Sequence, residues 1–328
     1  MRVLITDRAW PDVQIEEDVL KHIGAQVVDA ESQPNSSLVE LARDVDAIAA
    51  CWAPVSHEML DAAPSCRVVS RFGIGLDNIP IDECTRRGIV VSYVPDYCIP
   101  EVADHTIALL LGLLRNIVFL DQQIKQGVYD LSAAPSMSRL QGQTLGLVGF
   151  GRIARAVRFR AVSLGLRVVA TSASGNDHGT GCPMVTLDEL LSTSDLVSLH
   201  CPLTDSTHHL LDETALASMK SHAVVVNTSR GALIDHHAAW NALQQGNLGG
   251  LALDVYDPEP PNLKDPELGP LFRDPRVVAT PHAAFLSRES VAELRRRTAQ
   301  AIVDVVEGRQ PEQVVNPSTC ESLGLEPR

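Results

Sequence analysis

The sequence predicts an α/β protein with two parallel sheets, each wound by crossover helices. Short β-branched runs alternate with helical stretches along almost the whole chain, which is typical of this class. One of these runs leads into a glycine-rich turn that is followed by a helix. The chain has 328 residues, enough for about two domains at roughly 150 residues each.

The first series of runs predicts one open α/β unit. Helical stretches separate its strands, so successive strands are expected to lie parallel. The expected strands cover residues 2–7, 46–52, 66–72 and 88–94.

The second series predicts a doubly wound sheet of six strands. Helical stretches again lie between the runs. The expected strands cover residues 144–150, 166–171, 196–200, 223–228, 251–255 and 276–280.

Two long helices are expected to connect these units. Pro100 fits the first turn of a crossing helix that runs to about Gln126, because apolar residues recur there at helical spacing. Another helix follows the last strand, with Ser287 as its N-cap and Gly308 at its far end. This helix leads the chain back to the first unit.

The composition argues against several classes of protein. With 45% hydrophobic and 21% charged residues the chain is expected to fold. Its formal net charge of −14 repels nucleic acid and anionic membrane surfaces. The longest apolar stretch, 107–114, is far shorter than the roughly 20 residues that span a bilayer, and the first residues lack a signal peptide. We therefore expect a cytoplasmic protein without nucleic-acid or membrane partners.

No metal site is expected. The seven cysteines are odd in number and scattered without a CxxC pair, so we interpret most of them as buried reduced thiols. The pairs His208-His209 and His236-His237 have no cysteine or further histidine at zinc-ligand spacing. We interpret both pairs as surface histidines.

The glycine-rich turn predicts a dinucleotide site. An expected strand runs into Gly149-Phe150-Gly151-Arg152-Ile153-Ala154. In such a turn the first glycine bends the chain, the second lets the backbone approach a pyrophosphate, and Ala154 is small enough for packing of helix on strand. The following helix offers unpaired N–H groups to the phosphates. The strand before it and the helix after it favour this interpretation over an ordinary glycine turn.

The residue that would select the dinucleotide is Ser172. An NAD site usually places an acid about 20 residues past the turn, and an NADP site offers an arginine. Residues 171–177 supply neither an acid at that place nor an arginine. We predict NAD, because no cation is offered to a phosphate, and dual use of NADP stays open.

A second glycine pair, Gly73-Ile74-Gly75, also follows an expected strand. Asn78 occupies its third small position, so this turn is not a second dinucleotide site. Its backbone amides are suited to hold a small anion such as a substrate carboxylate, and a purely structural turn is the alternative.

These observations assign a role to each unit. We predict a Rossmann-type NAD(P)-binding domain over residues 99–285. A discontinuous, flavodoxin-like α/β substrate domain covers residues 1–98 and 286–328. The site is expected in the cleft between them.

Three charged residues follow expected strands of the second unit, where the ligand crevice of such a sheet opens. The guanidinium of Arg230 suits bidentate binding of a carboxylate. The imidazole of His282 suits proton transfer to a carbonyl oxygen, and the carboxylate of Glu259 favours its charged form. Singly, each residue has a structural explanation, as a surface pair, a solvated loop acid or a strand cap. Together they predict a hydride-transfer site.

The motifs together resemble the D-isomer-specific 2-hydroxyacid dehydrogenase family along nearly the whole chain. The resemblance is carried by the glycine turn, Asn227 to Gly231, Leu253 to Val255 with Glu259-Pro260, and Thr280 to His282. Within the family, the segments 101–106 and 281–285 look like the phosphoglycerate dehydrogenase and C-terminal-binding-protein branch, although that branch carries Trp at Phe285.

The resemblance implies roles for individual residues. Arg230 would anchor the carboxylate, Glu259 would tune the histidine, and His282 would be the acid and base. Cofactor contacts would come from Gly149, Phe150, Gly151, Arg152, Ile153, Ser172, His200, Cys201, Pro202, Thr207, Thr228, Ser229, Arg230, Asp254 and His282, with Asp254 facing the nicotinamide amide. Substrate contacts would come from Trp52, Ile74, Gly75, Tyr97 and Arg230. Relatives are usually dimers through the cofactor domain, so a homodimer is expected.

The expected function is hydride transfer between NAD(P) and a small D-2-hydroxy acid or its 2-oxo acid. One alternative is an NAD(H)-sensing dimer, like C-terminal-binding proteins, with weak or vestigial activity. Another is hydride acceptance from an unusual small oxyanion.

Overall fold

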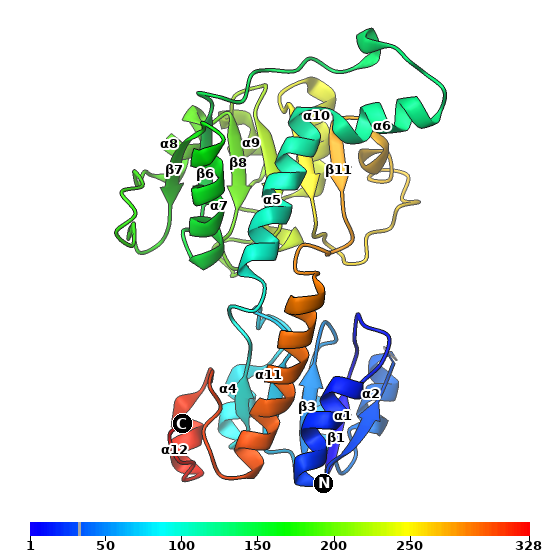
Figure 1. The fold of residues 1–328 in the computed structure, drawn as a ribbon, viewed down its shortest axis with the longest axis vertical. Coiled ribbons are helices and arrows are strands. Elements are labelled where there is room, and N and C mark those ends of the chain that lie inside the picture. Colours follow the sequence, from blue (N-terminus) through cyan, green and yellow to red (C-terminus); the bar gives the residue numbers. More distant parts are fainter. Residues whose placement is uncertain (32–33) are drawn as a thin grey trace. The chain divides into compact units, whose positions relative to one another are not determined.

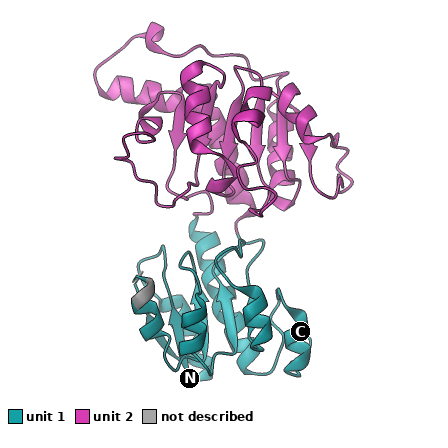
Figure 2. Ribbon diagram, turned by 180° about the vertical axis from the view of Figure 1, so that it is seen from behind, with its two compact units in different colours: residues 1–97, 287–328 teal, residues 98–286 magenta. Residues whose placement is uncertain are grey.

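The computed structural model describes residues 1–31 and 34–328, and the chain divides into two compact units (Figure 2). Unit 1 consists of Met1–Tyr97 and Ser287–Arg328, and unit 2 of Cys98–Leu286. Each unit is built around one parallel sheet, which confirms the predicted α/β class.

The sheet of unit 1 has five parallel strands in the order β2-β1-β3-β4-β5, the order of flavodoxin-like folds. One of them, β2, was not expected from the sequence, because its four residues are only partly buried and form the edge of the sheet. The strands are β1 (Arg2–Ile5), β2 (Gln26–Asp29), β3 (Ala47–Ala50), β4 (Val68–Arg71) and β5 (Val90–Ser92).

The C-terminal segment completes unit 1 through a long helix, α11 (Arg288–Val306). Ser287 caps it as predicted, in a capping box with Ser290. The helix packs against α1 (Gln14–Leu20) and β4, and the hydroxyl of Ser70 donates to the Thr298 carbonyl at 3.0 Å. The remaining helices are η1 (Lys21–Ile23), α2 (Asn35–Leu41), α3 (His57–Ala62), α4 (Ile81–Arg86) and α12 (Pro317–Ser322).

The sheet of unit 2 has six parallel strands in the order β11-β10-β9-β8-β6-β7. An isolated parallel bridge from Ala170 to Met184 extends the edge beyond β7. When this bridge is counted as a reduced third strand, the order follows the Rossmann pattern. The strands are β6 (Thr144–Val148), β7 (Arg167–Thr171), β8 (Leu196–Leu199), β9 (Val224–Asn227), β10 (Gly250–Leu253) and β11 (Val277–Ala279).

Helices cover both faces of this sheet, and Figure 1 shows α5 and α7 in front of it. One core cluster joins the sheet to α5 and α7, and a second joins its other face to α8, α9 and α10. Burial on both faces explains the continuous apolar runs of these strands. The helices are α5 (Ile99–Leu114), α6 (Ile117–Lys125), η2 (Leu131–Ala133), α7 (Arg152–Ser163), α8 (Leu187–Thr193), α9 (Glu213–Ser218), η3 (Gly231–Leu233), α10 (His236–Gln245) and η4 (Leu271–Arg273).

The predicted crossing helix over 100–126 is wrong in one respect, because it is two helices. Asn116 adopts a left-handed backbone (φ 49°) between α5 and α6, and their axes differ by 62°. Asparagine tolerates this conformation better than most residues. By length and composition alone, no single described helix would cross a membrane, and this bent pair is the only combination that passes such a test.

The seven cysteines are all free thiols, and six of them are buried. This confirms the interpretation of the cysteines as buried reduced thiols.

Candidate active site

The candidate residues of unit 2 follow the carboxyl ends of its strands. Because all six strands are parallel, these ends meet at one edge of the sheet, where ligands bind in open α/β folds. Gly149 follows β6, Ser172 follows β7, His200 follows β8, Arg230 follows β9, Glu259 follows β10 and His282 follows β11.

The glycine turn connects β6 to α7. Gly149 has φ 89°, and a Cβ atom there would lie 2.6 Å from the backbone carbon of His200. Side chains are therefore excluded at Gly149 by the protein itself. At Gly151, the N-cap of α7, an added Cβ would meet no atom within 4 Å. The absence of a side chain at Gly151 thus leaves open space beside the helix N-terminus.

In this turn, backbone groups rather than side chains are available to bind a ligand. The ring of Phe150 is buried in the core cluster, and Ala154 is fully buried. Arg152 and Ile153 occupy the first turn of α7, whose N–H groups have no partner within the helix. This end of α7 is therefore suited to bind an anion such as a pyrophosphate.

Ser172 lies at the start of the exposed segment after β7. Its hydroxyl is 3.4 Å from that of Ser174, and the segment continues through residues 175–181 without an arginine. Residues 172–181 therefore bring no lysine or arginine to the position where the ribose of a dinucleotide would bind.

The turn after β8 is held by its own hydrogen bonds. His200 accepts or donates through Nε2 to Ser198 at 2.9 Å, and burial lowers the pKa of His200 to about 4. The hydroxyl of Thr207 donates to the Pro202 carbonyl at 2.7 Å, and burial raises the pKa of Cys201 to about 11. At neutral pH this turn therefore carries a neutral imidazole and a neutral thiol.

The segment after β9 is tied to its neighbours. Ser229 Oγ donates to the Cys201 carbonyl at 2.7 Å, and Thr228 Oγ1 lies 2.9 Å from Thr106 Oγ1. Arg230 is half-buried, its Nη1 donates to the Ser229 carbonyl at 2.7 Å, and its own carbonyl accepts from Asn227. These contacts hold the guanidinium close to the strand end.

His282 and Glu259 are in direct contact. Nδ1 of His282 lies 2.6 Å from Oε1 of Glu259, although the two residues follow different strands. The carboxylate accepts from Nδ1 and so fixes the tautomer and the orientation of the ring. His282 has a left-handed backbone (φ 52°), and its ring meets Phe285 edge-on at 6.2 Å.

The carboxylate of Asp254 holds the loop that carries His282. It accepts from Thr280 Oγ1 at 2.6 Å and from the backbone N–H groups of Ala283 and Ala284 at 2.8 and 2.9 Å. Burial would raise the pKa of Asp254, but these hydrogen bonds and one from His105 outweigh it and lower the pKa. Asp254 is fully buried, and its expected contact with the nicotinamide amide stays a prediction.

His105 was missed by the sequence analysis as a site residue. It reaches from α5 to this loop, with Nε2 3.0 Å from Thr280 Oγ1 and 3.5 Å from Asp254 Oδ1. The Thr280 hydroxyl gives its proton to Asp254, so it accepts from His105. No signal in the sequence connects a histidine of this helix to the distant loop.

Four of the five candidates for substrate binding belong to unit 1, and the fifth, Arg230, belongs to unit 2. Trp52 follows β3, Ile74 and Gly75 follow β4, and Tyr97 follows β5, so they too lie at the carboxyl ends of parallel strands. Trp52 is 40% exposed, whereas Tyr97 is buried.

Asp7 organises the turn around Trp52. It follows β1, and its carboxylate accepts from the backbone N–H groups of Cys51, Trp52 and Ala53 at 3.0, 2.7 and 3.1 Å. This buried carboxylate therefore fixes the backbone on either side of Trp52.

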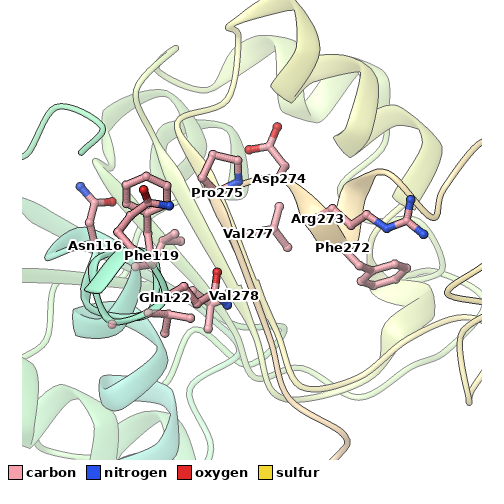
Figure 3. A pocket seen from close by; sticks show the side chains of 13 residues that line it. Asn116, Phe119, Gln122, Phe272, Arg273, Asp274, Pro275, Val277 and Val278 are labelled. Atoms are coloured by element: carbon pink, nitrogen blue, oxygen red, sulfur yellow. The ribbon is translucent and has the colours of Figure 1, made fainter. Parts of the chain in front are cut away.

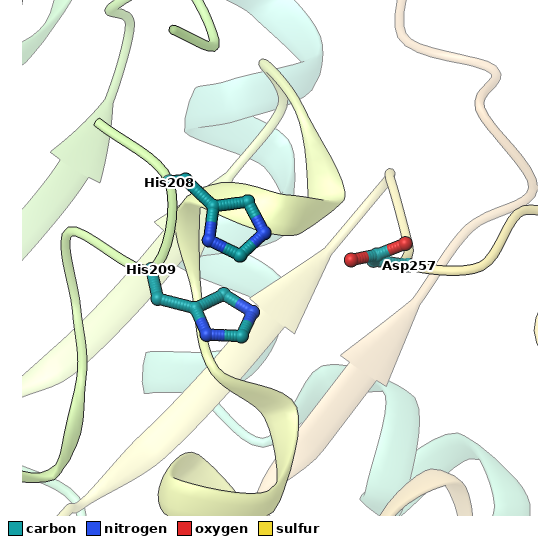
Figure 4. A group of neighbouring side chains, drawn as sticks. All are labelled: His208, His209 and Asp257. Carbon is teal, nitrogen blue, oxygen red and sulfur yellow. The ribbon is translucent and has the colours of Figure 1, made fainter. Parts of the chain in front are cut away.

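The interpretation of the paired histidines as surface residues is wrong for His236. It begins α10 and is only 7% exposed. His208 and His209 lie with Asp257 in a group of potential ligand atoms (Figure 4).

The sheet order, the glycine turn at α7 and the acid–imidazole pair at the strand ends define a dinucleotide-dependent oxidoreductase. A family model described as the NAD binding domain of D-isomer specific 2-hydroxyacid dehydrogenases matches residues 107–284. The chain belongs to the D-isomer specific 2-hydroxyacid dehydrogenase family. It is an NAD(P)-dependent enzyme that interconverts 2-hydroxy acids and 2-oxo acids, as the sequence predicted.

Relatives cover almost the full length of the chain. A glyoxylate reductase of Korarchaeum cryptofilum is 34% identical over 323 residues, 96% of each chain. The D-lactate dehydrogenase of Aquifex aeolicus, solved with NAD and lactic acid, is 25% identical with a TM-score of 0.84 over 98% of both chains. An NADPH-dependent glyoxylate/hydroxypyruvate reductase of Sinorhizobium meliloti, solved with NADP and malonate, is 28% identical with a TM-score of 0.84 over 100% of this chain and 98% of its own.

Proposed function

We propose that the enzyme reduces a small 2-oxo acid of the glyoxylate class to its 2-hydroxy acid. The observation that carries this proposal is the contact of His282 with Glu259. His282, Glu259 and Arg230 follow the three neighbouring strands β11, β10 and β9. The names of the Korarchaeum and Sinorhizobium relatives point to glyoxylate and hydroxypyruvate, both short 2-oxo acids.

Arg230 anchors the substrate carboxylate. A guanidinium forms two parallel hydrogen bonds with a carboxylate and so fixes its orientation, which a lysine point charge does less well. The Asn227 amide donates to the Arg230 carbonyl and the guanidinium donates to the Ser229 carbonyl, so both the backbone and the side chain of Arg230 are held in place.

His282 supplies the proton. In the reductive direction its imidazolium donates from Nε2 to the carbonyl oxygen, and in the oxidative direction the neutral ring takes the proton back. Glu259 accepts from Nδ1 and so stabilises the imidazolium. Asp254 and His105 act as positioning residues, because the buried Asp254 carboxylate and the His105 ring hold the 280–284 loop.

The cofactor fits the turn at α7. The open space at Gly151 and the N-terminal end of α7, which carries the positive end of the helix dipole, suit its pyrophosphate. When bound, its nicotinamide delivers hydride to the substrate carbonyl carbon or accepts it back. We propose NAD as the preferred form, with NADP accepted, because Ser172 offers neither an acid against the 2′-phosphate nor an arginine for it.

Further contacts with the cofactor come from the turns after β8 and β9. Thr207, Thr228 and Ser229 use their hydroxyls within the protein, and Phe150 uses its ring, so we propose that these residues act mainly by shaping the backbone. His200, Cys201 and Pro202 contribute a neutral surface.

Unit 1 is proposed as the substrate domain. The backbone of Ile74 and Gly75 binds the substrate carboxylate as a second anion site, and Trp52 and Tyr97 supply apolar surface. Gly73 supports this turn, because its φ of 144° is a backbone conformation that side chains rarely adopt.

The resemblance to the phosphoglycerate dehydrogenase and C-terminal-binding-protein branch is proposed only for the segments 101–106 and 281–285. The corresponding alternative, an NAD(H)-sensing dimer with vestigial activity, is favoured by no feature of the site. The intact pair of Glu259 and His282 favours catalysis instead.

A homodimer through unit 2 is part of the proposal. Residues 117–137 carry a run of exposed apolar side chains, among them Tyr129 at 94% and Leu131 at 89% exposed. A cavity of about 440 Å³ lies beside α6, lined by Phe119, Phe272 and Val278 among others (Figure 3). An exposed apolar surface of this extent is typical of an interface, and a second copy of unit 2 would bury it.

The direct test is nicotinamide absorbance with a panel of 2-oxo acids. We expect turnover of glyoxylate and hydroxypyruvate with NADH, and slower or comparable turnover with NADPH. Pyruvate and longer 2-oxo acids serve as the matched series. Binding of the cofactor without turnover of any of these acids would contradict the proposal.

A further inference from the structure

Three side chains of unit 2 converge outside the proposed proton-transfer pair. His208, His209 and Asp257 each offer one ligand atom, and these atoms all lie within 4.8 Å of one another. The two imidazoles stack with their centroids 4.0 Å apart and their planes at 25°. Figure 4 shows both rings on the side that faces the Asp257 carboxylate.

The backbone holds these three residues in place. His209 has φ 49°, its N–H donates to the Ala232 carbonyl at 2.8 Å, and the next residues form a bridge between Leu211 and Ile234. Asp257 follows Tyr256, whose hydroxyl donates to the Thr280 carbonyl at 2.7 Å. A left-handed backbone at a non-glycine residue is strained, and such residues are concentrated at functional sites. The cluster is therefore held by the fold and is not a chance meeting of mobile side chains.

A fourth polar group lies in the same neighbourhood. His236 is 7% exposed, and its Nε2 atom is buried without a hydrogen-bond partner. Burial lowers the pKa of His236, and the charges of Asp257 and His209 act on the same ring in opposite directions. Buried polar atoms are almost always satisfied in native proteins, so an orphaned nitrogen here indicates a group that the chain itself does not supply.

We propose that His208, His209 and Asp257 bind a divalent transition-metal cation of the zinc class. Two imidazole nitrogens and a carboxylate oxygen suit zinc, whereas magnesium and calcium prefer oxygen ligands alone. Zinc bonds of about 2.0–2.1 Å place neighbouring ligand atoms about 3.4 Å apart in a tetrahedron. The two rings and the carboxylate therefore need to close by roughly an ångström, a rotation that the exposed His208 and Asp257 side chains allow. A water molecule would complete the tetrahedron.

The position of the site gives it a structural consequence. Its ligands come from the segment between β8 and α9 and from the segment after β10, so a cation would join the two. Asp257 precedes Glu259 by two residues, so the cation would restrain the segment that carries the partner of His282. The proposal goes beyond the dehydrogenase function and does not rest on it.

The test is a calorimetric titration of the full chain, without a histidine tag and treated with EDTA, with Zn²⁺ alone. Cofactor and 2-oxo acids are left out, because 2-oxo acids bind metals. We expect one equivalent of zinc to bind, at least tenfold more weakly to Asp257→Asn and to His209→Ala. His222→Ala is the matched control, because it removes an exposed imidazole 3.2 Å from a carboxylate elsewhere in unit 2. Its zinc affinity should equal that of the wild type.

A second readout protects the test against misfolding. Zn²⁺ should raise the Tm of the wild type and of His222→Ala, and leave the Tm of Asp257→Asn unchanged. Asp257 is exposed, so Asp257→Asn is expected to fold, and it tests the zinc site by itself if His209→Ala fails to fold. Absence of zinc binding by the wild type, unchanged affinity in Asp257→Asn, or an equal loss in His222→Ala would each overturn the proposal.

Discussion

At the scale of single residues, two glycines of one turn have different reasons to be glycine. Gly149 is required by the protein, because a Cβ would overlap the backbone of His200 and φ is 89°. Gly151 meets no atom of the chain at that place and has φ −76°, so the fold itself does not require a glycine there, and we attribute it to the proposed cofactor. The fold therefore requires glycine at Gly149, whereas we propose that cofactor binding requires it at Gly151.

This difference predicts opposite outcomes for two matched variants. Gly149→Ala should lower the free energy of unfolding by about 2–4 kcal/mol, since backbone must move and a positive φ is strained. Gly151→Ala should unfold within about 0.5 kcal/mol of the wild type but bind NADH at least tenfold more weakly. Urea unfolding and fluorescence titration measure the two effects. Equal stability of both variants would show that the turn is not constrained in this way.

The roles proposed for His282 and Arg230 predict that one variant changes mainly kcat and the other mainly KM. His282→Ala should lower kcat by about 10²–10⁴-fold with NADH affinity retained, because only proton transfer is lost. Arg230→Lys should instead raise KM for the 2-oxo acid by about tenfold or more, since the bidentate geometry is lost. Steady-state kinetics with glyoxylate checks both. Full activity of His282→Ala would mean that another group moves the proton.

At the scale of elements, a buried ion pair joins two helices of unit 1 that lie far apart in sequence. Arg295 on α11 contacts Glu16 on α1 at 2.7 Å, with side chains only 6% and 1% exposed. Trp10 stacks on the same guanidinium, 5.4 Å from its ring centroid. The pair attaches the C-terminal helix to the first helix of the fold.

Breaking this pair should destabilise unit 1 strongly. Glu16→Ala leaves a buried guanidinium with less than its full set of partners, so we expect a loss of about 3–5 kcal/mol. Glu293→Ala is the matched control, because it removes an exposed partner of Arg297 on the same helix and should cost less than about 0.5 kcal/mol. Urea unfolding compares the two. A loss of similar size in both variants would contradict the role given to burial.

At the scale of the whole molecule, the exposed apolar surface along α6 and the following segment predicts the oligomeric state. Light scattering should give twice the mass of the 328-residue chain. Ile124→Asp, at a side chain 56% exposed on α6, should convert the dimer to a folded monomer because it places a charge in the interface. Val162→Asp, at a side chain 49% exposed on α7, should leave the dimer intact. A monomeric wild type would remove this part of the proposal.

Much of the site could be predicted from the sequence, because open α/β sheets place their ligands at strand ends. The rule, the glycine motif and the chemistry of the side chains together predict the residues that follow β6, β9, β10 and β11, and the fold and family are confirmed. The strand β2 and the break at Asn116 could not be predicted, because four half-buried residues and one left-handed asparagine leave only a weak local signal.

The amino-acid sequence by itself determined which strands are buried, where the dinucleotide turn lies and which charged groups follow the strands, since local patterns encode these features. Only the tertiary structure decided that Asp254 is turned into the protein, that His105 supports it, and that His208, His209 and Asp257 share one place. The physical reason is that such contacts join residues on different strands and loops, and distances between them exist only after the sheet has formed.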